Sequence, residues 1–169
     1  MKSRVLYSLK LTVFLTLAGS FFSLSALADP NIYLNPSSGR WEVSSNWSLG
    51  SPSADDSIYI TNPAPTAPII VTVDATTSSG FTNTLTVANL TISAPAAGSY
   101  TNTLFLNSAG TSTPFQVISN LTVLPGGALT ISNSALTVDN GTTPTTNDLG
   151  SVVEFDGGPV RAFNSIIDT

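Results

Sequence analysis

The chain has 169 residues and no cysteine, which excludes disulfide bonds and thiolate metal sites. All ten acidic residues lie from Asp29 onward, whereas only Arg40 and Arg161 of the five basic residues do, so the chain after residue 28 has a net charge of −8. It also lacks lysine and histidine in that part. Without a basic patch to neutralise phosphate, we expect it to bind neither nucleic acid nor anionic membrane surfaces.

The segment 1–28 has the pattern of a secretory signal peptide. Lys2, Arg4 and Lys10 precede an apolar run, and Ala26-Leu27-Ala28 forms a small-residue cleavage site. A transmembrane anchor is the alternative, but glycine and serine interrupt the run and the cleavage site follows at once. We expect cleavage after Ala28, no membrane insertion afterwards, and a secreted, extracellular or cell-surface location.

Residues 29–68 are expected to form an N-terminal cap. A short strand over 31–34 is followed by a turn over 35–39, and Trp41 and Trp47 stand on either side of a second turn. A strand over 57–61 comes next. Residues 62–68 contain three prolines, cannot sustain a hydrogen-bonded ladder, and mark the boundary with the following unit.

Residues 69–169 repeat a short phrase in which threonine alternates with apolar residues between turns. This alternation is typical of strands with one buried and one exposed face. Matching apolar positions recur at closely similar intervals, at Leu85, Leu104, Leu121, Leu136 and Val153. Such near-constant spacing predicts an all-β fold in which coils, each as long as one interval, stack as a β-solenoid.

A β-sandwich or meander is the alternative fold. Leu121, Leu129 and Leu136 follow one another at about half that interval, a spacing that also suits successive hairpin strands. Pro125-Gly126-Gly127 would then be a hairpin turn. A sandwich, however, does not require a near-constant coil length, and the solenoid is therefore the preferred prediction.

Two sets of phrases resemble a known family. The first set is Gly39-Arg40-Trp41, Asn46-Trp47-Ser48, Gly50-Ser51-Pro52 and Asp55-Asp56, and the second is Asn120-Leu121-Thr122-Val123 and Gly126-Gly127-Ala128-Leu129-Thr130-Ile131. They look like the opening segment and first coils of bacterial secreted proteins with autotransporter-type or adhesin-type β-helix repeats. The resemblance implies a right-handed β-helix that acts as a passenger or surface stalk, associated with the outer membrane if it belongs to a longer protein.

The tryptophans have two interpretations. An exposed indole can stack on a sugar, so Trp41 and Trp47, with Tyr59, would suit a carbohydrate-binding module. Alternatively, the two rings cover the open end of the first coil, where bare strand edges would invite aggregation. We favour the capping role, because the pair stands at the start of the repeats and is flanked by turns.

The acidic residues are the candidates for metal binding or catalysis. Asp55 and Asp56 are adjacent in a turn and suit a structural calcium ion, whereas Glu154 and Asp156 are two apart on one strand. A polysaccharide-degrading β-helix enzyme would need such paired acids in a groove. Because no basic partner accompanies them, we expect no enzyme and regard most of these acids as solvated turn residues.

The leading function is therefore a secreted or cell-surface structural or adhesive module. Its partners would be surface glycans or other cell-surface proteins, and the C-terminal coil around Ile166 and Ile167 would allow self-association. Asn83, Asn102 and Asn120 stand one or two residues before a leucine of the repeats, which suggests amide ladders between coils, or simply a tolerance of turn geometry. Nothing in the repeats identifies a ligand.

Overall fold

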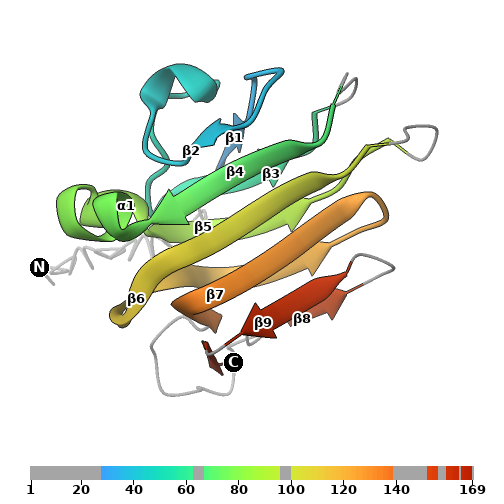
Figure 1. The fold of residues 1–169 in the computed structure, drawn as a ribbon. Helices are drawn as coiled ribbons and strands as arrows, with labels where there is room; N and C mark the ends of the chain where they lie inside the picture. The colour runs from blue at the N-terminus through green and yellow to red at the C-terminus, as the bar shows by residue number, and fades with distance from the viewer. Residues whose placement is uncertain are drawn as a thin grey trace, which may run out of the picture.

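The computed structural model describes residues 28–62, 67–95, 100–138, 152–155, 159–163 and 165–168. These residues form a β-solenoid of about four turns, in which strands of successive coils stack in parallel (Figure 1). The prediction of an all-β β-helix is confirmed. The predicted signal peptide lies outside the described residues, except for Ala28.

The strands differ widely in length, because the longest ones bend around the corners of the solenoid. β6 alone has 22 residues. In chain order the elements are β1 (Asp29–Ile32), β2 (Gly39–Arg40), η1 (Ser44–Asn46), β3 (Asp56–Ile60), β4 (Ile69–Asp74), α1 (Ala75–Gly80), η2 (Thr82–Thr84), β5 (Thr86–Ile92), β6 (Asn102–Val123), β7 (Gly127–Val138), β8 (Val152–Phe155), β9 (Val160–Phe163) and β10 (Ile166–Asp168).

The coils have three sides. The first side stacks β1, β3, the end of β5, the end of β6, and β8. The second side stacks β2, β4, the beginning of β6, the beginning of β7, and β9; these strands lie next to one another in Figure 1, with the first side behind them. The third side pairs the beginning of β5 with the middle of β6, then the end of β7 and β10.

The alternative of a β-sandwich or meander is wrong. Every pairing between the described strands is parallel, whereas strands joined by hairpin turns would pair in antiparallel fashion. The segment around Gly126 is a corner between the first and second sides. It leads β7 back beside the start of β6, with Gly127 opposite Asn102.

The predicted coil length, one interval between matching leucines, is also wrong. In the strand register Leu121 is the partner of Leu90 and Val153, and Leu104 is the partner of Val71 and Leu129, so a full turn is markedly longer than that interval. The shorter spacing found in the sequence mostly separates positions two sides apart: the third side, at Val117, lies between Leu104 and Leu121, and the second side, at Leu129, lies between Leu121 and Leu136. Equivalent leucines on different sides all face the interior, so hydrophobicity alone does not distinguish a side from a full turn.

The core consists of apolar columns that run along the solenoid. Ile58, Leu90 and Leu121 form a column on the first side, and all three are essentially inaccessible to solvent. Burying each such side chain stabilises the fold by about 1.5–3 kcal/mol. A single coil has no partner for its inward residues, so this stabilisation exists only between stacked coils.

One short helix was not expected from the sequence. α1 follows β4 directly and begins with a capping box, in which the Asp74 side chain accepts hydrogen bonds from the backbone N–H groups of Thr76 and Thr77. The Thr77 hydroxyl group in turn accepts from the backbone N–H of Asp74. These reciprocal bonds satisfy backbone N–H groups at the start of α1, which have no partner within the helix.

The corner at Gly127 provides a test of the close approach between coils. A β-carbon at this position would lie 2.2 Å from the backbone oxygen of Ile92, whereas a β-carbon at Gly80 would meet nothing within 4 Å. We expect Gly127→Ala to lower the free energy of unfolding by about 2 kcal/mol or more, measured by urea denaturation, because backbone must move. The control, Gly80→Ala, should change it by less than about 0.5 kcal/mol. Equal effects of the two substitutions would contradict this corner geometry.

Candidate functional site

Trp41 and Trp47 lie in the interior of the first coil. Their exposed fractions are 0% and 4%, and their rings meet edge to face with centroids 4.9 Å apart. Trp41 also meets Phe115 of β6 edge to face at 4.9 Å, and Trp47 meets Tyr33 at 5.1 Å. The four rings form an aromatic cluster that fills the N-terminal end of the solenoid.

Both indole N–H groups are satisfied inside the protein. Trp41 Nε1 donates to the backbone oxygen of Thr84 at 2.8 Å, and Trp47 Nε1 donates to the backbone oxygen of Trp41 at 2.7 Å. Burial also raises the pKa of the Tyr33 hydroxyl group to about 12. Neither indole offers a face to a sugar, so these two rings do not form a carbohydrate platform in this structure.

The segment that carries Trp47 also covers a strand edge. Leu34 N donates to the backbone oxygen of Asn46, and Ser48 N donates to the backbone oxygen of Ile32. Tyr33 and Trp47 form an antiparallel bridge in the same place. This segment thus runs along the outer side of β1 and occupies backbone groups that a bare edge strand would expose.

Replacing Trp41 distinguishes a packing role from a binding role. We expect Trp41→Ala to lower the free energy of unfolding by about 3–5 kcal/mol, because it opens a large cavity and leaves the Thr84 carbonyl group without its donor. Leu49→Ala is the control, since Leu49 is 58% exposed, and it should cost less than about 0.5 kcal/mol. A Trp41→Ala protein with unchanged stability in urea would contradict the packing role.

The structure separates the roles of Asp55 and Asp56. Asp55 is exposed, whereas Asp56 is buried and its Oδ2 accepts hydrogen bonds from Asn31 Nδ2 and from Ser53 N, both at 2.9 Å. Among the described residues there is no group of three or more histidine, cysteine or acidic side chains that could hold a metal ion. Asp56 therefore links the start of β3 to the first coil through these hydrogen bonds.

Tyr59 lies on the outer surface of the first side and is half-buried. It stacks between Ile32 of β1 and Thr91 of β5. Of the three residues predicted to bind a ligand, it is the one whose side chain reaches the surface. The two tryptophans point inward, so the three residues do not form one site.

An amide ladder is present on the same side. Asn120 Nδ2 donates to Asn89 Oδ1 at 3.0 Å, and Asn89 Nδ2 donates to the Ser57 hydroxyl group at 3.0 Å. The sequence pattern suggested such a ladder with Asn83, Asn102 and Asn120 as candidate members. Asn120 takes part in it, but Asn83 is exposed next to α1 and Asn102 is buried at the start of β6. The ladder forms where Asn89 and Asn120 share a register position.

A charged network at the first coil was not expected. Arg40 Nε donates to Glu42 Oε1 at 2.5 Å, and a terminal nitrogen of Arg40 donates to Asp74 Oδ1 at 2.6 Å. The hydroxyl group of Thr77 donates to the other oxygen of Glu42 at 2.9 Å. The network fastens β2 to the junction of β4 and α1, so these charged residues hold elements together.

The charged network lowers the pKa of the Asp74 carboxyl group. Desolvation raises its pKa, but hydrogen bonds from Thr76 N–H and from Arg40 outweigh that effect, and the pKa lies below its ordinary value. The unfolded chain then binds more protons than the folded chain in acid, so the stability from this group is present above the ordinary pKa and is lost as pH falls.

We therefore expect acid to destabilise the protein partly through Asp74. The melting temperature of the unmodified protein should fall as pH is lowered from about 5 to about 2, and Asp74→Asn should flatten this dependence. Asp55→Asn is the control, because it removes an exposed carboxylate that makes no side-chain hydrogen bond with the described residues. An Asp74→Asn protein whose melting temperature keeps the full slope would contradict the assignment.

Serine hydroxyl groups connect the coils at the corner between the second and third sides. Ser134 Oγ donates to the backbone oxygen of Ser132 at 2.9 Å and accepts a bond from Ala109 N at 3.0 Å. Ser165 Oγ repeats the arrangement one coil later, where it donates to the backbone oxygen of Phe163 at 2.7 Å. These hydroxyl groups satisfy backbone groups where the chain turns through the left-handed region at Asn133.

A pocket of about 540 Å³ lies at this corner and is open to solvent. Its lining comprises Gly110, Thr111, Asn133, Ser165 and Ile166. None of these five residues is ionisable, so they supply no general acid, general base or charged ligand. Of the acids considered for catalysis, Glu154 is described only in its backbone, and Asp156 lies outside the described residues.

Comparisons with known proteins give no identification: no family, no curated protein and no solved structure matches this chain. Within the described part of the chain, no helix is both long enough and apolar enough to cross a membrane. The function therefore has to be argued from the residues and the geometry.

Proposed function

We propose that this chain is a secreted or cell-surface structural module without enzymatic activity. The observation that carries the proposal is the way in which the first coils use their ionisable residues. Glu42, Asp56 and Asp74 are all engaged in bonds between coils or caps, which leaves the described surface of the first three coils mainly to hydroxyl, amide and apolar groups.

The packing of the coils supports the same proposal. The stacked columns and the covered edge of β1 favour a body that keeps its shape, as a spacer requires. A catalytic site would instead need acids or nucleophiles set in a groove with perturbed protonation. The lining residues of the corner pocket are of neither kind.

Export is the part of the proposal that comes from the segment 1–28. The positive start, the apolar run and the small residues before Asp29 are the features that a signal peptidase recognises. The absence of lysine after this segment also suits a surface that meets no anionic partner inside the cell. A location outside the cytoplasm is therefore proposed together with the structural role.

Expression of the full chain in a bacterium with a periplasm tests this proposal. We expect the intact mass of the exported product to correspond to a chain that begins at Asp29. Ala28→Leu, which removes the small residue at the cleavage site, should leave the unprocessed precursor. Retention of the unmodified chain in the cytoplasm would contradict export, and release of sugars from polysaccharides by the purified product would contradict the non-enzymatic role.

A further inference from the structure

Both cations of the chain after residue 28 lie in one outward row of the second side. The row runs through adjacent register positions on β2, β4, β6, β7 and β9 and consists of Arg40, Thr72, Phe105, Thr130 and Arg161. Neighbouring rungs of a ladder are about 4.8 Å apart, which places the two arginines roughly 19 Å from each other. They therefore act as separate groups.

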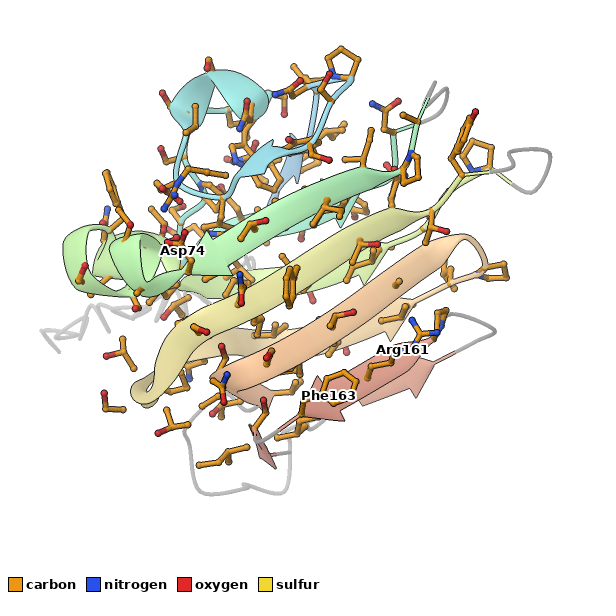
Figure 2. All side chains as sticks on the ribbon, in the orientation of Figure 1. Asp74, Arg161 and Phe163 are labelled. Carbon is orange, nitrogen blue, oxygen red and sulfur yellow. The ribbon has the colours of Figure 1, made fainter. Side chains whose placement is uncertain are left out.

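The two arginines have opposite surroundings. Arg40 is bound by Glu42 and Asp74, so its charge is more than neutralised locally. Arg161 is exposed and forms no ion pair with any residue whose side chain the structure describes. Figure 2 shows Arg161 on β9 and Asp74 at the end of β4, with β6 and β7 between them.

Aromatic rings and hydroxyl groups surround Arg161. Phe163 stands two residues further along β9, on the same face, and is 58% exposed. Phe105 lies two rungs away in the Arg161 row, while Thr130 and Ser132 occupy the adjacent strand opposite Arg161 and Phe163. We call Phe105, Thr130, Ser132, Arg161 and Phe163 the Arg161 patch.

The exposure of the Arg161 patch comes from its orientation. Val160 and Ala162 continue the inward columns of Leu129 and Ile131, so Arg161 and Phe163 project outward from the sheet. The hydrogen-bonding edge of β9 points along the solenoid axis, in a different direction. These two side chains thus face solvent whatever lies beside that edge.

The chemistry of the Arg161 patch matches a carboxylated sugar. A guanidinium group forms paired hydrogen bonds with a carboxylate, an aromatic ring covers the apolar face of a sugar ring, and hydroxyl groups bond to sugar hydroxyls. We propose that the Arg161 patch binds a glycan in which uronic acid residues are separated by neutral sugars. A densely charged polyanion does not fit, because the patch has one cation and the chain after residue 28 carries a net charge of −8.

The hydroxyl groups and aromatic rings of the Arg161 patch, rather than its charge, favour this occupant over an acidic peptide. A carboxylate alone engages only Arg161, whereas a sugar that carries one also offers hydroxyl groups to Thr130 and Ser132 and an apolar ring face to Phe163. This binding site goes beyond the proposed structural role, because a rigid module would keep its fold with or without it. Loss of binding and loss of fold are therefore separate outcomes.

Calorimetric titration of the exported protein tests the proposal. The probe is a tetrasaccharide of alternating glucuronic acid and N-acetylglucosamine, and its carboxyl-reduced, neutral form is the matched control. We expect the reduced sugar to bind the unmodified protein at least about tenfold more weakly, and Arg161→Gln to weaken binding of the acidic sugar by a similar factor. Arg161→Gln should not distinguish the two sugars.

Three further variants refine the test. Arg161→Lys keeps the charge but loses the planar fork and should cause a smaller loss, about three- to fivefold, while Phe163→Ser should weaken both sugars. Thr122→Ser, on the first side, should leave affinity unchanged. Circular dichroism checks that each variant is folded. If Arg161→Gln does not fold, Arg161→Lys takes its place in the comparison of the two sugars.

The proposal is overturned by any of three results. The first is failure of the acidic tetrasaccharide to bind at millimolar concentration, and the second is equal binding of both sugars by the unmodified protein. The third is a glutamate-containing peptide that binds as tightly as the sugar, since this would show a general carboxylate patch and overturn the assignment to a glycan.

Discussion

The stacking of inward apolar side chains from one coil onto the next is the interaction on which the whole structure depends. Ile58, Leu90 and Leu121 contribute to a column that no single coil contains. The register of this column decides which residues face outward, because a shift of one residue exchanges the two faces of a strand. Every surface feature of the protein is therefore a consequence of the core register.

The N-terminal end shows how such a core begins. The aromatic cluster around Trp41 fills the interior, while the segment that carries Trp47 occupies the outer edge of β1. Arg40 and Asp74 add a polar connection outside the core. Packing, edge protection and charge pairing therefore all stabilise the first coil. They engage aromatic and charged residues, which are the types that a binding or catalytic site would also require.

The outward rows are free of this constraint. A threonine, asparagine or arginine can occupy an outward position at little cost, provided that the inward neighbours keep their columns. The ladder of Asn89 and Asn120 uses this freedom for cohesion between coils. The Arg161 row uses it differently, since it brings together residues from five strands that are far apart in the sequence. This separation of core and surface lets one scaffold keep a continuous apolar core while its outward rows vary in chemistry.

Alternating threonine and apolar residues were sufficient to predict strands and a solenoid, because the alternation is a local property of a half-buried strand. The coil length was not predictable in this way, because inward leucines on different sides have the same environment. Burial of Trp41 depends on Phe115, and the charge pairing of Arg40 depends on Asp74, which is distant in the sequence. Such contacts depend on how distant segments align across stacked coils, and the local sequence pattern does not show this alignment. The capping box is different: Asp74 and Thr77 stand three residues apart, so the signal for α1 is local, although no helix was expected there.

Paired cysteines test the register most directly, because the chain has no cysteine of its own. Thr91 and Thr122 are partners on adjacent rungs of the first side, one full coil apart. Their α-carbons are expected to be about 4.8 Å apart, a separation that a disulfide bond spans. We predict that Thr91→Cys combined with Thr122→Cys forms an intramolecular disulfide under mild oxidation, whereas Phe105→Cys combined with Thr122→Cys does not. Cross-linking of the second pair in place of the first would support the shorter coils suggested by the leucine spacing and would contradict the stacked columns described above.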